Sequence, residues 1–314
     1  MIEVDRLSKR FGSTRAVDQI SFQIRRGEVV GFLGPNGAGK TTTMRLMTRY
    51  LTADSGTVLI DGIDVQEDPL SVRRRVGYLP ESAPLYHDLS VIESLKFVAA
   101  IRGIPRTARK ERLSEVISVC GLGNVLTRDV GVLSKGFRQR VGLAQTLIHD
   151  PDILILDEPT SGLDPNQIVE IRELIRSIGR EKTIIISSHI LAEVQASCGR
   201  VLILHQGKIV GDGTAAGLAE QLQGNPRYFV LVVGEQQAIE TALVEADFVS
   251  RFDRGDDEGE ALGYTVSGMA QETRLGEKLF HLAGKHGLVL IEMRRESCSL
   301  EAVFSSLTRG EGCG

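Results

Sequence analysis

The chain has 314 residues, of which 42% are hydrophobic and 25% are charged. This length and composition favour a globular protein with a substantial core, organised as one large domain or two smaller ones. The formal net charge of −4 argues against nucleic acid as the main partner, because proteins that bind phosphate backbones usually carry a basic surface.

The cysteines and the apolar runs indicate the redox state of the thiols and whether the chain can span a membrane. Cys120, Cys198, Cys298 and Cys313 are scattered, without a CxxC pair or metal-ligand spacing, so we expect reduced thiols rather than a disulfide framework. The N-terminus lacks the apolar core of a signal peptide. No apolar run approaches the roughly 18 residues that a membrane-spanning helix needs. If the protein acts at a membrane, another chain must therefore span it.

The first two thirds of the chain alternate predicted strands and helices. Residues 1–30 alternate apolar and polar positions, which predicts antiparallel strands. Val29–Leu33 predicts a buried strand that runs into a glycine-rich turn, and helical spacing begins at Lys40. The later elements are a strand at Thr57–Asp61, a helical region from Val91 to about Cys120 broken at Gly103 and Pro105 and capped by Gly121, a helix at Phe137–His149, a strand at Ile153–Leu156, a helix at Pro165–Ile178, a strand at Thr183–Ser187 and a hairpin at Val201–Asp212 turning at Gln206-Gly207. This alternation predicts a mostly parallel sheet.

The last third predicts a separate, smaller unit. Thr214–Arg227 is polar and rich in Gly and Ala, which predicts a linker. The order that follows is a strand at Tyr228–Val233, a helix at Gln236–Glu245, strands at Phe248–Asp253 and Ala261–Val266, a helix at Gln271–His286 and a strand at Leu288–Glu292, with a final helix at Leu300–Leu307. This βαββαβ order fits a small ferredoxin-like α+β domain. We place the two domains at residues 1–220 and 221–314.

A phosphate-binding loop is the clearest chemical signal in the sequence. Gly34 to Thr41 reads GPNGAGKT, which matches G-x-x-x-x-G-K-[ST] and lies between a predicted strand and a predicted helix. The glycines allow backbone N–H groups to turn toward phosphate oxygens, and the helix N-terminus adds a favourable dipole. Lys40 supplies charge for the β- and γ-phosphates, and Thr41 offers a hydroxyl to Mg²⁺. The alternative, a glycine-rich turn that binds nothing, is disfavoured by this context. The predicted cradle consists of Gly34, Pro35, Asn36, Gly37, Ala38, Gly39, Lys40, Thr41 and Thr42.

A pair of acidic residues supplies the second signal, since kinases and GTPases share the loop alone. Residues 153–158 read ILILDE, so Asp157 ends a buried strand, and ligands bind at that end of strands in open α/β sheets. Asp157 can help hold Mg²⁺, and Glu158 can deprotonate a water in line with the γ-phosphate. An Asp-Glu pair is otherwise typical of a solvated loop or a helix start, but the buried strand and the phosphate loop favour catalysis.

With these motifs in place, the sequence resembles the ATP-binding subunits of ABC transporters over about residues 1–220. The matching pieces, in the family's order, are Phe11 for adenine stacking, the phosphate loop Gly34–Thr42, YLPE at Tyr78–Glu81 for the Q-loop, LSKGFRQR at Leu133–Arg140 for the signature, Asp157 and Glu158 for Walker B, SGLD at Ser161–Asp164 for the D-loop, and His189 for the switch histidine. The resemblance implies a fold with a parallel core sheet, an antiparallel β subdomain and a helical subdomain. It also implies ATP and Mg²⁺ as cofactors.

The resemblance gives several of these residues a role that each would not suggest alone. Ser134 would ordinarily cap a helix, and Asp164 could cap the helix beginning at Pro165. In the family, Ser134 and Gly136 would instead face a γ-phosphate bound by another copy, and Asp164 would act across the same interface. Phe11 alone would be a core or surface aromatic, and His189 alone a structural histidine. By resemblance, His189 contacts the γ-phosphate and orients the water.

The sequence also departs from the family pattern. The usual LSGGQ signature carries Lys135 and Phe137 at its third and fifth positions, and Glu81 stands where the Q-loop has glutamine. A carboxylate at position 81 can still offer oxygen to Mg²⁺, although its charge changes the coupling to a membrane partner. YLPE with LSKG resembles the branch that serves gliding-motility, drug, polysaccharide and copper-related export. LEAVFSSLT at Leu300–Thr308 resembles that branch's extra C-terminal domain.

The sequence is compatible with three functions. The first is the ATP-hydrolysing motor of an ABC exporter, working as a homodimer or pseudo-dimer through the nucleotide site, with a separate integral-membrane subunit and no nucleic acid. The resemblance places such a subunit in the cytoplasm, peripheral on the inner face of the membrane. The second is a soluble ABC-type ATPase acting on ribosomes or DNA, which the single cassette and acidic charge disfavour. The third, a non-enzymatic nucleotide sensor, is disfavoured by Glu158 and His189.

Overall fold

The computed structural model describes residues 2–222, 226–269, 272 and 274–296. The chain divides into two compact units, Met1–Ala215 and Ala216–Gly314. The expected linker at Thr214–Arg227 is wrong in its first part, because Ala215–Leu222 forms helix α8. Its AAGLAEQL sequence consists mainly of strong helix formers, and their propensity outweighs the polar composition that predicted a linker. No helix of the described residues is both long and apolar enough to cross a membrane.

A six-stranded sheet forms the centre of the first unit, in the order β10-β9-β3-β8-β7-β6. Its strands are β3 (Val29–Leu33), β6 (Val76–Leu79), β7 (Ile153–Asp157), β8 (Thr183–Ser188), β9 (Arg200–His205) and β10 (Lys208–Gly213). The neighbouring pairs among β9, β3, β8, β7 and β6 are parallel, and β10 joins antiparallel to β9. This arrangement confirms the predicted mostly parallel sheet.

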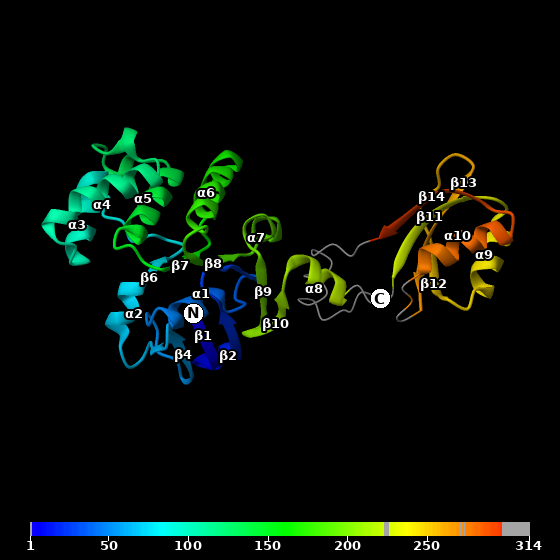
Figure 1. The fold of residues 1–314 in the computed structure, drawn as a ribbon, viewed down its shortest axis with the longest axis horizontal. Helices are drawn as coiled ribbons and strands as arrows, with labels where there is room; N and C mark the ends of the chain where they lie inside the picture. Colours follow the sequence, from blue (N-terminus) through cyan, green and yellow to red (C-terminus); the bar gives the residue numbers. More distant parts are fainter. Residues whose placement is uncertain (1, 223–225, 270–271, 273, 297–314) are drawn as a thin grey trace. The chain divides into compact units, whose positions relative to one another are not determined.

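The central strands are apolar on both sides, so the sheet separates two cores. Leu154, Leu156 and Ile184 face a helical layer made mainly of α3 (Val91–Ile101), α4 (Arg106–Val119), α5 (Lys135–Leu147) and α6 (Pro165–Ile178). Ile153, Ile155 and Ile185 face α1 (Lys40–Met47), α2 (Pro69–Arg75) and the antiparallel strands. Figure 1 shows α3, α4 and α5 grouped together on the side of the sheet away from α1. A further short helix, α7 (Leu191–Ser197), follows β8.

The antiparallel part of the first unit confirms the strands expected in residues 1–30. Its sheet has the order β2-β1-β4-β5. The strands are β1 (Ile2–Phe11), β2 (Thr14–Ile24), β4 (Ser55–Ile60) and β5 (Ile63–Asp64), and two short 3₁₀ turns lie elsewhere at Gly123–Val125 and Val130–Val132. Helix α2 and strand β6 were not predicted, because the short PLSVRRR and VGYL segments carry no complete apolar period.

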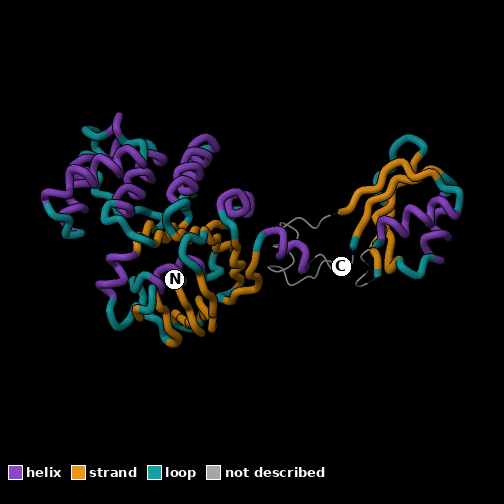
Figure 2. The backbone as a smooth tube through the Cα atoms, in the orientation of Figure 1, coloured by secondary structure: helices purple, strands orange, loops and turns teal. Residues whose placement is uncertain are grey.

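The second unit has the expected βαββαβ order. Its elements are β11 (Arg227–Val233), α9 (Gln236–Glu245), β12 (Val249–Arg254), β13 (Ala261–Gly268), α10 (Leu275–Lys285) and β14 (Val289–Glu296). The sheet order β12-β13-β11-β14 with antiparallel neighbours is that of a ferredoxin-like unit. Val230, Val232 and Tyr264 pack against α9 and α10, and Figure 2 shows both helices on one face of this sheet. The helix expected at Leu300–Leu307 lies outside the described residues.

Candidate nucleotide site

The phosphate loop has the backbone shape that its glycines predict. Gly37 and Gly39 have φ angles of 81° and 106°, in the left-handed region that side chains disfavour. A Cβ atom on Gly39 would lie 2.4 Å from the carbonyl oxygen of Ala16, so only glycine fits there. The buried Lys40 donates from Nζ to the carbonyl oxygen of Gly34 over 2.7 Å. A phosphate oxygen can take over this bond, because a charged acceptor binds an ammonium more strongly than a carbonyl does.

Asp157 lies next to this loop, and one of its two carboxylate oxygens accepts no hydrogen bond from the described residues. Its Oδ1 accepts hydrogen bonds from Thr41 Oγ1 at 3.1 Å and from Ser187 Oγ at 2.6 Å. Its Oδ2 is buried without a hydrogen-bond partner among the described residues, a costly arrangement for a carboxylate oxygen. A hydroxyl and a carboxylate are hard oxygen donors of the kind that Mg²⁺ prefers. The residues present therefore fit the metal that was expected at Thr41 and Asp157.

Glu158 lies between the phosphate loop and His189 and contacts both. Its Oε1 lies 3.4 Å from Lys40 Nζ, and its Oε2 lies 2.9 Å from His189 Nδ1. Its φ angle of 47° is uncommon for a residue with a side chain, and strain of this kind persists where the surroundings hold it. The backbone N–H of Glu158 donates to Ser187 Oγ over 2.8 Å. A carboxylate held beside a histidine and a phosphate loop can accept a proton from an attacking water.

Two hydroxyl-bearing positions that the sequence analysis did not single out hold this geometry. Ser187 contacts both Asp157 and Glu158, as described above. Ser188 donates to Glu193, which also accepts a bond from Thr160. The signal was visible as two serines at the end of the buried IIISS strand, directly before His189. Ser187 lies beside Asp157 because these two residues pair in register on the neighbouring parallel strands β7 and β8.

The signature and D-loop residues cap their helices, as their alternative interpretation predicted. Ser134 accepts from the backbone N–H of Phe137 at the start of α5, and Asp164 accepts from that of Gln167 at the start of α6. Gly136 packs closely, since a Cβ atom there would lie 2.7 Å from Gln167 Cδ. Ser134 is exposed, so this residue is accessible from outside the chain.

Lys135 and Phe11 take up positions that sequence alone could not give. Lys135 Nζ packs against Gly162 in the D-loop of its own chain. A Cβ atom added to Gly162 would lie only 2.2 Å from this nitrogen. Phe11 is the last residue of β1, and 49% of its surface is exposed. Lys9 Nζ lies over the ring of Phe11, 5.7 Å from the ring centroid. The aromatic ring of Phe11 is thus accessible, as a stacking platform must be.

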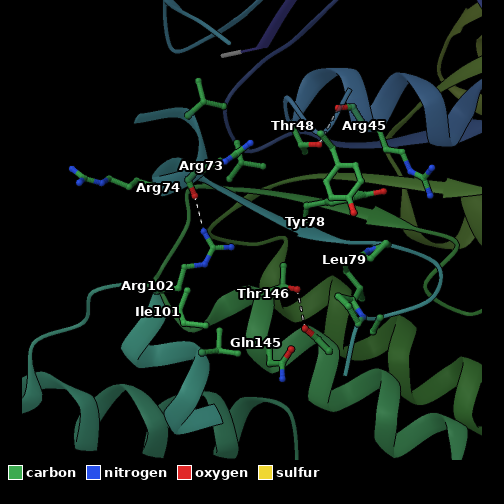
Figure 3. Close-up of a pocket in the computed structure, with 18 of the residues that line it drawn as sticks. Arg45, Thr48, Arg73, Arg74, Tyr78, Leu79, Ile101, Arg102, Gln145 and Thr146 are labelled. Carbon is green, nitrogen blue, oxygen red and sulfur yellow. Dashed lines mark hydrogen bonds between the residues drawn. The ribbon is translucent and has the colours of Figure 1, made fainter. Parts of the chain in front are cut away.

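Glu81 contacts the D-loop and adjoins a groove. Ser161 Oγ lies 3.5 Å from Glu81 Oε1, at the outer limit of a hydrogen bond. The residues on either side, Pro80 and Ser82, line a groove of about 820 Å³ between the β6 end of the sheet and the helical layer. Figure 3 shows this groove with Tyr78 and Leu79 on one side and Arg102 and Gln145 on the other. The Q-loop segment therefore lies between the groove and the D-loop.

Comparisons with known proteins show the family to which the chain belongs. Residues 17–161 match the family model described as ABC transporter. The chain is 39% identical over 254 residues to an uncharacterized ABC transporter ATP-binding protein, YhcH, of Bacillus subtilis, covering 80% of this chain and 81% of that protein. It is 35% identical to the bacitracin transport ATP-binding protein BcrA of Bacillus licheniformis, covering 100% of this chain and 99% of that protein.

A solved structure of the same family has a similar fold. A structure described as an ATP binding subunit of an ABC transporter superposes with a TM-score of 0.65 at 30% identity, covering 71% of this chain and 93% of that one. In this chain the phosphate loop, Asp157, Glu158 and His189 meet at one edge of the sheet. The chain therefore belongs to the ABC transporter ATP-binding proteins, as an ATP-hydrolysing subunit that drives a membrane transporter.

Proposed function

We propose that this chain powers an exporter by hydrolysing ATP held between two copies. The observation that carries the catalytic assignment is the cluster of Lys40, Asp157, Glu158 and His189, in which one Asp157 oxygen is buried without a partner. Export is supported by two relatives that cover nearly the whole chain. BcrA is named for bacitracin transport, and LnrL of Bacillus subtilis, 29% identical over 98% of this chain, is named for linearmycin resistance.

In the proposed reaction, the phosphate loop binds the β- and γ-phosphates through its N–H groups and Lys40. Thr41 Oγ1 and Asp157 would hold Mg²⁺, with Glu81 as a further oxygen donor from the Q-loop. The metal supplies positive charge that neutralises the phosphate oxygens. Glu158 accepts the proton of the water that attacks the γ-phosphate, and His189 orients Glu158 through the 2.9 Å contact. Phe11 would stack on adenine.

The two-copy arrangement rests on the exposed Ser134 at the N-terminus of α5. A helix N-terminus presents N–H groups and a positive dipole end, which suit a phosphate. We propose that Ser134 and Gly136 meet the γ-phosphate bound by another copy, and that Asp164 acts across the same interface. Closing on ATP and reopening after hydrolysis would then do mechanical work on the membrane subunit.

We place the membrane subunit at the groove beside Glu81, which would hold this chain peripherally on the inner face of the membrane. The Q-loop segment lines this groove and also contacts Ser161, so movement at one site can reach the other. Purification of the tagged chain from detergent-solubilised membranes tests the assignment. A transporter subunit brings a multispanning membrane protein with it, whereas a soluble ATPase of the ribosomal or DNA-directed class brings ribosomal or chromosomal components instead.

A further inference from the structure

Lys135 is a cation placed at the end of a helix that is already positive. It is the first residue of α5, directly after Ser134, and the first turn of this helix contains no acidic residue. The N-terminus of a helix carries partial positive charge, so a lysine in the first turn is unfavourable by itself. A conflict of this kind between a residue and its local setting is typical of functional positions. An anion bound at this end of α5 would remove the conflict.

The ammonium group of Lys135 has no acceptor among the described residues. Lys135 is exposed, and it makes no hydrogen bond or ion pair with any residue that the structure describes. Its Nζ nevertheless packs against Gly162 in the D-loop, where an added Cβ atom would lie 2.2 Å from this nitrogen. Gly162 has a φ angle of 66°, a conformation that favours glycine. The contact with Gly162 therefore places the charge beside the D-loop without neutralising it.

A second contact of the same kind joins the signature to the D-loop helix. The side chain of Gln167, on α6, lies against Gly136, where an added Cβ atom would be 2.7 Å from Gln167 Cδ. Lys135 of the signature thus contacts a glycine of the D-loop, and Gln167 after the D-loop contacts a glycine of the signature. Ser134, Gly136 and Gln167 also line one groove. The two segments are packed together, so another copy would meet them as one surface.

Two anions are candidates for Lys135. Glu81 contacts the neighbouring D-loop residue, with its Oε1 3.5 Å from Ser161 Oγ, but it forms no ion pair with Lys135. The other candidate is the γ-phosphate that Ser134 would meet in the proposed two-copy arrangement. A terminal phosphate carries more negative charge than a carboxylate and offers three acceptor oxygens, and it suits the N-terminus of a helix. The position of Lys135 beside Ser134 therefore favours the phosphate.

We propose that Lys135 binds the γ-phosphate of the ATP held by another copy and supplies a cation to it across the interface. The inference rests on the proposed two-copy function. Lys40 would contact this phosphate from the chain that holds the ATP, and Lys135 from the opposite chain, so its charge is balanced from both sides. The contact with Gly162 already restrains the Lys135 side chain, so less side-chain entropy is lost when the phosphate binds.

Sedimentation with ATP tests the contact in chains that carry Glu158→Gln, which are expected to retain the nucleotide. We expect Lys135→Gln to weaken pairing about tenfold at each site, and so about a hundredfold for a dimer with two sites, because a hydrogen bond to a charged group is lost at both. Lys135→Arg keeps the charge and should retain most of the pairing. Lys110→Gln, an exposed change on α4, is the matched control and should pair as its parent does. ATP binding to the single chain should be unchanged in all three.

Mixed pairs show which chain supplies the cation. One chain carries Lys40→Ala and holds no nucleotide, and the other carries Glu158→Gln and holds ATP. Lys135→Gln should weaken pairing when it is placed in the Lys40→Ala chain, whose signature faces the ATP, and should have little effect in the other chain. Energy transfer between two dyes, one on each chain, measures the pairing. An equal loss from either chain would overturn the inference, because Lys135 would then act within its own chain.

The remaining outcomes separate this inference from the function on which it rests. Equal pairing of Lys135→Gln and its parent would refute the phosphate contact and leave the two-copy function intact. An effect of Lys135→Gln that disappears when Glu81→Gln is also present would refute it as well, since Lys135 would then balance Glu81 within one chain. Absence of ATP-driven pairing in the Glu158→Gln parent would instead count against the two-copy function itself.

Discussion

Thr160 Oγ1 donates a hydrogen bond over 2.7 Å to Glu193, a buried carboxylate that also accepts from Ser188 Oγ at 2.9 Å. Thr160 lies two residues after Glu158, and Ser188 directly precedes His189. Glu193 therefore joins the two segments that carry Glu158 and His189. Glu193 is a positioning residue, because the contact between Glu158 and His189 depends on how these two segments lie relative to each other.

We expect Glu193→Ala to lower kcat with little change in ATP affinity, because the phosphate loop is untouched. Two buried hydroxyls would lose their acceptor, at a cost of about 1–3 kcal/mol in the free energy of unfolding. Glu193→Gln, whose amide oxygen still accepts, should be milder in both respects. Steady-state ATP hydrolysis and urea unfolding measure the two effects. The exposed Glu173→Ala serves as control, and full activity in Glu193→Ala would remove this role.

Lys40→Ala should abolish nucleotide binding. Lys40 is 6% exposed and lies within 3.4 Å of Glu158 Oε1, so its loss removes the positive charge meant for the phosphates and leaves Glu158 to repel them. Fluorescent-nucleotide titration measures the affinity. Normal ATP affinity in this variant would refute the assignment of the phosphate cradle.

Glu158→Gln should bind ATP, hardly hydrolyse it and accumulate as a dimer. The amide keeps the size of the side chain but cannot take the proton of the attacking water, so loss of a general base should slow turnover by about 10²–10⁴-fold. Phosphate release measures turnover, and sedimentation with ATP measures pairing. Turnover at the wild-type rate would exclude Glu158 as the base.

Ser134→Arg should block ATP-driven pairing and leave binding of ATP to the single chain largely intact. The structure shows that this change also removes the α5 cap, which costs about 1 kcal/mol. Ser134→Asp separates the two effects, since aspartate caps a helix as well as serine but repels a phosphate from another copy. We therefore expect Ser134→Asp to be stable and monomeric in sedimentation. ATP-dependent dimers of both variants would contradict the interface.

Acid should destabilise the fold through His149. Burial, followed by the charge of Arg102, lowers its pKa from 6.5 to about 4, and its Nδ1 is buried without a partner among the described residues. The unfolded chain takes up this proton as pH falls through about 6.5, but the folded chain does so only near 4, so stability is lost between those values. We expect about 2 kcal/mol, reduced from the full shift because the ring is partly solvated.

Urea unfolding between pH 7 and 4.5 measures this loss. His149→Gln keeps a donor for the carbonyl oxygen of Val76, which His149 Nε2 contacts at 3.2 Å, and no longer titrates. We expect the variant to lose less stability over this range than wild type. Equal slopes in the two proteins would show that His149 does not control the acid sensitivity.

Local patterns in the sequence were enough to predict most of the elements and to single out the candidate catalytic residues. Helices Pro165–Ile178 and Gln236–Glu245 match their predicted bounds residue for residue, because their apolar period and flanking residues are local signals. The phosphate loop and the Asp157-Glu158 pair were equally readable, since each chemistry needs its residues adjacent in the chain. The short helix α2 gave no such signal, and the polar composition of the expected linker hid the strong helix formers of Ala215–Leu222.

Only the tertiary structure decided which distant residues meet. Ser187 reaches Asp157 because β7 and β8 pair in parallel with these two residues in register. Arg73 and Arg102 share one groove because the helical layer packs beside α2. Such pairings depend on strand register and on how helices pack, which no local spacing encodes. The sequence by itself therefore determined what chemistry the chain carries, and the packing determined which side chains hold that chemistry in place.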